Sequence, residues 1–157
     1  MYTVEQNNTD ALQSLDCASD WTNTIIGLRW RVRAIRGATT VTENTREAII
    51  EAVTELIEAI ETHNQLDTEE IVSVTFSVTS DIDAMFPAAV ARRRPGWDNV
   101  PLLDVQHMEV ENSLQKCIRV LIHINTPLPK SQLRHVYLQQ AAKLRPDLAL
   151  SKASRIC

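Results

Sequence analysis

Residues 116–125 form an aliphatic stretch whose side chains alternate between the two faces of an expected β-strand. One face would carry only aliphatic side chains, those of Ile118, Val120, Ile122 and Ile124. The opposite face would carry Arg119, Leu121 and His123, so it is also partly apolar. A strand with apolar residues on both faces needs a cover on each side, and therefore belongs to a layered domain.

Hydrophobic periodicity also predicts the other elements. Strands are predicted over residues 31–36, 71–79, 100–110 and 116–125, and helices over residues 43–63, 87–94 and 131–144. In the first helix one stripe collects the apolar residues Ile49, Ala52, Val53, Leu56, Ile57 and Ile60. In the strand over 71–79, one face would collect Val72, Val74, Phe76 and Val78. Asp67 is expected to cap a short helical turn that includes Glu70.

The irregular order of these elements predicts an α+β domain with a mixed β-sheet and helices on one face. The other face then needs a partner, because its strands also carry aliphatic side chains. Residues 1–27 are mostly polar and lack periodicity, so we expect a disordered leader followed by one domain over residues 28–157. A chain of 157 residues is long enough for one domain with a real core.

Composition excludes several classes of function. The formal net charge of −4 argues against nucleic acid or an anionic membrane as the main partner. No apolar run approaches the roughly 18 residues that a membrane helix needs. The three cysteines have no metal-ligand spacing and form no disulfide framework, so we expect a cytoplasmic protein without a metal site.

Three side chains stand out as candidates for binding an anion. Arg119 lies inside an aliphatic strand, where a guanidinium either reaches solvent at a sheet edge or meets a ligand. Arg36 precedes the small residues Gly37 and Ala38, which fit either a turn or close approach of a ligand to the backbone. Tyr137 lies on the apolar face of its predicted helix, where it packs in the core while its hydroxyl still needs a partner.

Four short blocks carry a family resemblance in their order and separation. They are Ile35-Arg36-Gly37-Ala38-Thr39-Thr40, Lys116-Cys117-Ile118-Arg119-Val120, Arg134-His135-Val136-Tyr137-Leu138 and Leu144-Arg145-Pro146-Asp147-Leu148. From about Trp30 to the C-terminus the chain resembles the monofunctional chorismate mutases of the Bacillus type. The resemblance implies a homotrimer whose sheets enclose a pseudo-barrel core, with active sites in the clefts between adjacent subunits. It also implies the rearrangement of chorismate to prephenate, a step of phenylalanine and tyrosine biosynthesis that uses no cofactor.

The resemblance assigns roles to particular residues. Arg119 would be the catalytic cation at the ether oxygen of the substrate, and Arg36 would bind a substrate carboxylate. Phe86, Ala88 and Arg92 would form a wall that belongs to the neighbouring subunit. The complete substrate-binding set implied in this way is Arg36, Phe86, Ala88, Arg92, Leu103, Asp104, Val105, Gln106, His107, Arg119, Tyr137, Leu144 and Arg145.

The chain departs from the family pattern between Leu103 and His107. Well-known members carry a glutamate at the position of His107 and commonly a cysteine at the position of Asp104. Ala89 replaces a lysine found in some members. Either Asp104 supplies the missing carboxylate as a catalytic group, or the site has lost this charge and only binds its ligand. We expect the first, although residues three apart on a regular strand point to opposite faces unless a bulge lies between them.

Two other classes of function remain open at this point. One is a non-catalytic trimer that binds chorismate-like dianions. The other is an imine/enamine deaminase of a structurally similar trimeric family, which shares the interface clefts but lacks the four blocks. Turnover of chorismate would separate these alternatives from a chorismate mutase.

Overall fold

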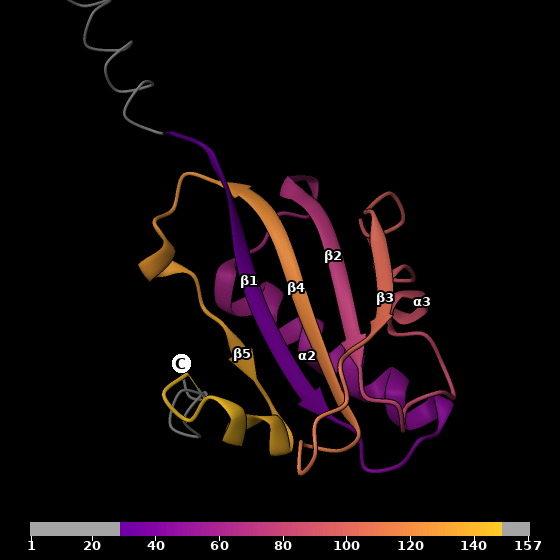
Figure 1. Ribbon diagram of the computed structural model, residues 1–157. Coiled ribbons are helices and arrows are strands. Elements are labelled where there is room, and N and C mark those ends of the chain that lie inside the picture. The colour runs from indigo at the N-terminus through magenta and orange to yellow at the C-terminus, as the bar shows by residue number, and fades with distance from the viewer. Residues whose placement is uncertain (1–28, 149–157) are drawn as a thin grey trace, which may run out of the picture. The chain divides into compact units, whose positions relative to one another are not determined.

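The computed structural model describes residues 29–148, and the expected leader over residues 1–27 lies outside the described residues. A five-stranded sheet with the order β3-β2-β4-β1-β5 forms the centre of the fold (Figure 1). Its strands are β1 (Arg31–Thr40), β2 (Ile71–Val78), β3 (Leu102–Gln106), β4 (Cys117–Thr126) and β5 (Val136–Tyr137). β4 is antiparallel to β1 and β2, whereas β3 is parallel to β2 and β5 is parallel to β1. The predicted mixed sheet of an α+β domain is therefore confirmed.

The long helix α2 (Arg46–Asn64) follows from its cap and its apolar stripe. The Thr45 hydroxyl accepts a hydrogen bond from the Ala48 amide at 3.2 Å, and Gln65 ends the helix with a left-handed φ of 47°. The buried residues of α2 are the predicted stripe of Ile49, Ala52, Val53, Leu56, Ile57 and Ile60. Full burial of such a side chain contributes about 1.5–3 kcal/mol, so this stripe is a main source of stability.

The second helix, α3 (Pro87–Ala91), packs against α2, and both cover the same face of the sheet (Figure 1). The predicted aliphatic face of β4 lies under them, with Ile118 and Ile122 fully buried. Trp97 is fully buried beside α2, and its Nε1 donates a hydrogen bond of 2.8 Å to Glu61. Arg94 donates to the same carboxylate at 2.6 Å. These bonds give partners to the indole N–H of Trp97 and to the Glu61 carboxylate at the edge of the core.

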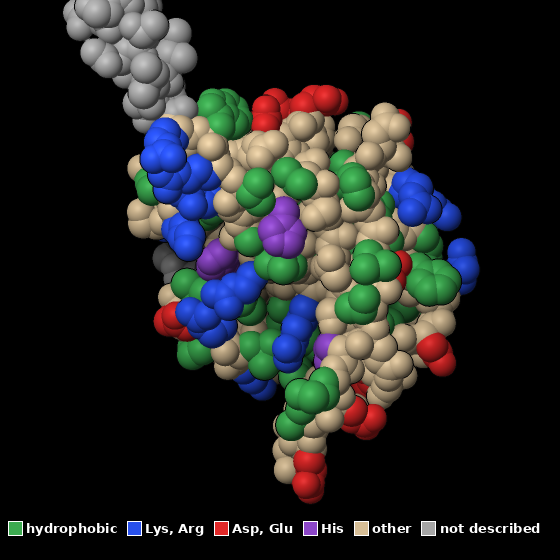
Figure 2. Space-filling model, turned by 45° about the horizontal axis from the view of Figure 1, so that its top comes forward, with side chains coloured by type: hydrophobic (Ala, Val, Ile, Leu, Met, Phe, Trp, Pro, Cys, Tyr) green, Lys and Arg blue, Asp and Glu red, His purple; other side chains and the backbone are tan. Residues whose placement is uncertain are grey.

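The opposite face of the sheet, here called the open face, has neither α2 nor α3 on it. Leu103 and Val105 of β3 point to this face and are 58% and 38% exposed, and Val32 of β1 is 56% exposed. Hydrophobic side chains are visible among polar ones across this side of the molecule (Figure 2). Within residues 29–148 the open face therefore keeps apolar surface in contact with solvent.

The helix predicted over residues 131–144 is wrong. Three short elements replace it, namely a 3-10 turn at Lys130–Gln132, the strand β5 and a 3-10 helix at Gln139–Leu144. Val136 pairs with Gly37 in parallel register, and the Leu138 amide donates to the Ala38 carbonyl at 2.9 Å. This pairing with β1 outweighs the local helical periodicity, and Gln139 has a left-handed φ of 49° that interrupts any helix.

Other boundaries differ from the prediction by a few residues. β1 continues to Thr40 because Thr39 and Thr40 pair with Ile118 and Cys117 of β4. β3 and α3 are shorter than predicted, ending at Gln106 and Ala91. The predicted cap at Asp67 is confirmed, since its side chain accepts a hydrogen bond from Glu69.

A further difference concerns β2. Its register against β4 shifts between Ile71 and Ser73, which is the sign of a β-bulge. Val72 is therefore 40% exposed, although it was predicted to share a face with Val74 and Phe76. Ile71 is buried in its place.

Candidate active site on the open face

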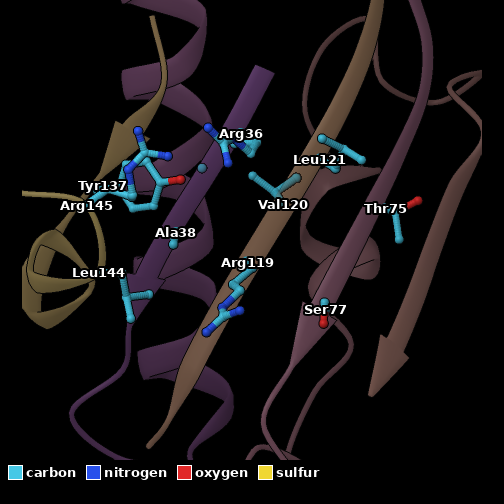
Figure 3. A pocket seen from close by; sticks show the side chains of 11 residues that line it. Arg36, Ala38, Thr75, Ser77, Arg119, Val120, Leu121, Tyr137, Leu144 and Arg145 are labelled. Carbon is cyan, nitrogen blue, oxygen red and sulfur yellow. The ribbon is translucent and has the colours of Figure 1, made fainter. Parts of the chain in front are cut away.

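A pocket of about 560 Å³ lies on the open face, where β1, β4 and β5 meet the turn after the last 3-10 helix (Figure 3). Five of the predicted binding residues line it, namely Arg36, Arg119, Tyr137, Leu144 and Arg145. The other lining residues are Gly37, Ala38, Thr75, Ser77, Val120 and Leu121. The structure thus brings residues from both ends of the domain into one site.

Strand register explains why the two central arginines share this pocket. Arg119 pairs with Ala38 on one side and with Ser77 on the other. Arg36 lies two residues before Ala38 on β1, so its side chain points to the same face as Arg119. The small neighbours Ala38 and Ser77 leave space beside the guanidinium of Arg119, and Figure 3 shows this side chain at one end of the pocket.

The other end of the pocket holds Arg36, Tyr137 and Arg145 (Figure 3). Tyr137 is 8% exposed and pairs with Ala38 through the short strand β5. Arg145 donates two hydrogen bonds to Asp147, at 2.9 and 2.7 Å, so its guanidinium is held in a fixed plane. The hydrogen bonds from Arg145 lower the pKa of the Asp147 carboxyl. Because Tyr137 is buried and also lines the pocket, it is both a core residue and a pocket residue.

Gly37 is needed for packing on the helix-covered face of the sheet more than for the shape of the pocket. A Cβ atom at this position would lie 2.8 Å from Ile60 Cδ1 and 2.9 Å from Val120 Cγ1. These distances are shorter than real Cβ contacts, so only glycine lets β1 and α2 pack this closely. The small side chain that faces the pocket belongs to Ala38, which is fully buried.

His107 lies beside Arg119, as the polar residue that follows β3. Its Nδ1 is 3.0 Å from the Ser77 hydroxyl, and its amide donates to the Val78 carbonyl at 3.0 Å. Burial lowers the pKa of the His107 imidazole, and the nearby charge of Arg119 lowers it further. At neutral pH the group next to Arg119 is therefore a neutral imidazole.

Asp104 lies on the opposite face of the sheet from Arg119. It pairs with Phe76, whose side chain is fully buried on the helix side, and the register of β3 runs unbroken from Leu102 to Gln106. Its Oδ1 accepts a hydrogen bond of 3.0 Å from the Ala88 amide, in the first turn of α3. Burial raises the pKa of the Asp104 carboxyl, while the Ala88 amide and Arg92 lower it. Asp104 therefore does not enter the pocket of its own chain.

Four of the remaining predicted residues line a second, smaller hollow of about 200 Å³. Phe86, Asp104, Val105 and Gln106 line this hollow together with Val78, Ile82, Asp83, Met85 and Pro87. Phe86 is 71% exposed, and α3 carries the buried Ala88 and ends beside the exposed Arg92. Leu103 points instead to the open face. Within one chain, the predicted binding residues therefore do not all meet in one pocket.

Sequence reasoning missed the two polar side chains of β2 in the pocket, Thr75 and Ser77. Their signal was present, since they alternate with the buried residues Val74 and Phe76. Among residues 29–148, no group of three or more His, Cys, Asp and Glu side chains is placed to hold a metal ion. No helix within the same residues is long and apolar enough to cross a membrane.

Comparisons with known proteins agree with this geometry. The chorismate mutase AroH of Bacillus subtilis (strain 168) is 42% identical over 125 residues, which cover 80% of this chain and 98% of the relative. The chorismate mutase AroH of Thermus thermophilus is 47% identical over 118 residues, which cover 74% and 96% of the two chains. A solved chorismate mutase from Clostridium thermocellum matches with a TM-score of 0.68 at 42% identity, covering 71% of this chain and 98% of that one. Residues 32–148 also match the profile of the family described as chorismate mutase type I. The chain therefore belongs to the chorismate mutase type I family.

Proposed function

We propose that this protein is a chorismate mutase, which rearranges chorismate to prephenate within a single bound molecule. The observation that carries this proposal is the convergence of Arg36, Arg119, Tyr137 and Arg145 on one pocket in a member of this family. Three guanidinium groups suit a substrate with two carboxylates. The tyrosine hydroxyl adds a directional contact at the wall of the pocket.

The reaction needs no nucleophile and no proton transfer, so catalysis depends on positioning and on electrostatic stabilisation. Arg36, Tyr137 and Arg145 would hold the flexible dianion in the folded conformer that brings the reacting carbons together. Arg119, at the other end of the pocket, would stabilise the negative charge that develops on the ether oxygen as its bond breaks. The division of the arginines between two ends of the pocket supports this division of roles.

We propose further that the active protein is a homotrimer, with each pocket completed by a neighbouring subunit. Leu103, Val105 and Val32 leave apolar surface exposed on the open face, which a second copy of the chain would bury. Phe86 lines the second hollow, Ala88 and Arg92 lie in and directly after α3, and none of the three lines the Arg119 pocket of its own chain. A pocket formed between subunits would unite the two parts of the predicted binding set.

Asp104 fits the same arrangement. It shares the second hollow with Phe86, so we place it on the wall that a subunit offers to its neighbour. There its carboxylate would face Arg119 of the other chain and accept a hydrogen bond from the ring hydroxyl of the substrate. The alternative is that neutral His107, which lies beside Arg119 of its own chain, accepts that hydrogen bond instead.

The decisive experiment measures turnover of chorismate by the purified protein, together with its mass in solution. We expect prephenate as the product and a mass of three chains. Arg119→Ala should abolish most turnover, whereas Arg93→Ala, which changes an exposed arginine outside the pocket, should have little effect. Tight binding of chorismate without turnover would indicate a non-catalytic binder, and turnover of an imine in place of chorismate would indicate a deaminase. A fully active monomer would refute the shared pocket.

A further inference from the structure

His135 makes a contact with the pocket that the proposed mechanism does not use. Its Nδ1 accepts a hydrogen bond of 3.0 Å from the backbone amide of Arg36. His135 is half-buried and stands directly before β5, which is only two residues long. The imidazole therefore adds one more bond to the short seam between β1 and β5.

This seam positions two groups of the pocket at once. Arg36 carries the bonded amide, and Tyr137 lies two residues after His135. The backbone part of the seam consists of the pairs Gly37–Val136 and Ala38–Tyr137, with the bond from the Leu138 amide to the Ala38 carbonyl. Burial of Val136 and the bonds of Asn64 to the Arg134 backbone also hold this segment, but the His135 bond is the one that ties it directly to the amide of Arg36.

The contact requires one protonation state of His135. An amide donor faces Nδ1, so this nitrogen must present its lone pair and the proton must lie on Nε2. A proton added to Nδ1 would set one donor against another and add a positive charge to the site. The charged groups around the imidazole are Arg36 of β1 and Arg145 of the last turn, whose own partner is Asp147. On the side of α2, the Arg134 backbone is bonded to the uncharged Asn64.

We propose that neutral His135 is a positioning residue, which fixes Arg36 and Tyr137 for substrate binding and releases them when it becomes protonated. The proposal rests on the proposed function, since it names the groups that a substrate would meet. Two effects keep His135 in this neutral form at neutral pH. Burial lowers the pKa of His135, and the charges of Arg36 and Arg145 lower it further, so the neutral form dominates at neutral pH.

Two substitutions separate the hydrogen bond from the titration. His135→Asn keeps an acceptor at about the place of Nδ1 and cannot be protonated, whereas His135→Leu fills similar space without an acceptor. We expect His135→Leu to raise KM about 2- to 12-fold, the range that one hydrogen bond supplies, with a smaller change in kcat. His135→Asn should stay within about twofold of the natural protein at pH 8, because the acceptor is retained.

The pH profile provides the second readout. In the natural protein KM should rise as the pH falls from about 8 to about 5, and in His135→Asn it should stay nearly flat. The same pair of profiles is also measured in a His107→Gln background, because the imidazole of His107 beside Arg119 gains a proton as the pH falls as well. His63→Asn is the matched control, since the Nδ1 of His63 contacts only the Ala59 carbonyl of its own helix. An unchanged KM in His135→Leu, or a pH dependence that persists in His135→Asn, would overturn the proposal.

Hydrogen exchange of the Arg36 amide tests the same contact without any substrate. Protection of this amide should decrease in His135→Leu and at acid pH, and should remain in His135→Asn. If His135→Leu does not fold, the natural protein and His135→Asn can still be compared for the pH dependence of KM and for hydrogen exchange of the Arg36 amide, and these two measurements test the proposal. A protein that turns over no chorismate but shows this pattern of protection would refute the proposed function alone. Equal protection in every variant would refute the role of His135.

Discussion

Replacing Gly37 by alanine tests whether the close packing of β1 on α2 requires glycine at this position. The new methyl group would meet Ile60 Cδ1 at 2.8 Å, Val120 Cγ1 at 2.9 Å and Leu56 Cδ1 at 3.2 Å. Overpacking of this kind costs about 1–3 kcal/mol, and the restriction of the unfolded chain by alanine returns about 0.4–1 kcal/mol. We expect a net loss of about 1–2 kcal/mol, which corresponds to a fall in Tm of about 2–8 °C.

Thermal unfolding followed by circular dichroism measures this change, and a second substitution identifies its cause. Ile60→Val deletes Cδ1, the atom nearest to the new methyl group. Gly37→Ala combined with Ile60→Val should therefore be less destabilised than the sum of the single changes, by about 0.5 kcal/mol or more. Ile49→Val, which shortens another buried side chain of α2, is the control and should be additive with Gly37→Ala. If Gly37→Ala has a Tm at or above that of the natural protein, or if it is additive with Ile60→Val as well as with Ile49→Val, the contact with Ile60 does not require glycine at position 37.

Four further predictions address the site and its support. Arg119→Ala should lower kcat about 100- to 1000-fold with a smaller effect on KM, and Arg119→Lys should recover little because an ammonium places its charge differently; a change in KM alone would make Arg119 a binding residue. Asp104→Asn should keep the bond to the Ala88 amide, and hence Tm, while it lowers kcat because the neighbouring pocket loses its carboxylate. The double variant Asp104→Cys with His107→Glu should then restore activity. An unchanged kcat in Asp104→Asn would mean that His107 accepts the hydrogen bond from the substrate. Trp97→Phe removes the hydrogen bond to Glu61 and should lower the free energy of unfolding by about 1.5–3 kcal/mol, measured as a lower midpoint of urea unfolding. An unchanged midpoint would mean that the hydrogen bond from Arg94 is enough for Glu61. The free energy of unfolding should fall as the pH drops below the ordinary histidine pKa of 6.5, because folding lowers the pKa of His107 and His135 and the unfolded chain therefore binds more protons. Replacing both histidines should flatten this part of the pH profile of stability.

The sequence alone was enough to predict which side chains are buried in α2 and β4, because each of these elements has a regular apolar pattern of its own. The apolar stripe of α2 matches its buried face, and the alternation in residues 116–125 places Arg119 and Ile118 on opposite faces of β4, as observed. The cap at Asp67 was also predictable, because capping needs only a side-chain oxygen and a nearby amide. These features depend on neighbours in sequence, so they need no knowledge of the rest of the fold.

Features that depend on distant partners were missed. Val136 and Tyr137 have helical spacing to their neighbours, and only the exposed edge of β1 turns them into a strand. The same applies to the bulge at Val72, which depends on the register between β2 and β4. The family pattern behind the prediction for Asp104 does not tell which face of β3 its side chain occupies. The structure places it on the helix side of its own chain, where it pairs with Phe76 and accepts a bond from the Ala88 amide.

The seam between β5 and β1 joins parts of the chain that are far apart in sequence, since Arg36 and His135 are separated by 99 residues. Contacts across such a separation form slowly in folding, because the entropy of closing the loop is lost before they contribute free energy. The pairs of β1 with β4 span a similar separation, and both pairings are needed for the pocket. Tyr137 and Leu144 form part of its wall, so the site is complete only when residues 136–144 are docked on β1. A ligand that recognises only the finished pocket favours this docked state by mass action. Ligand concentration thus influences how many folded chains carry a complete site.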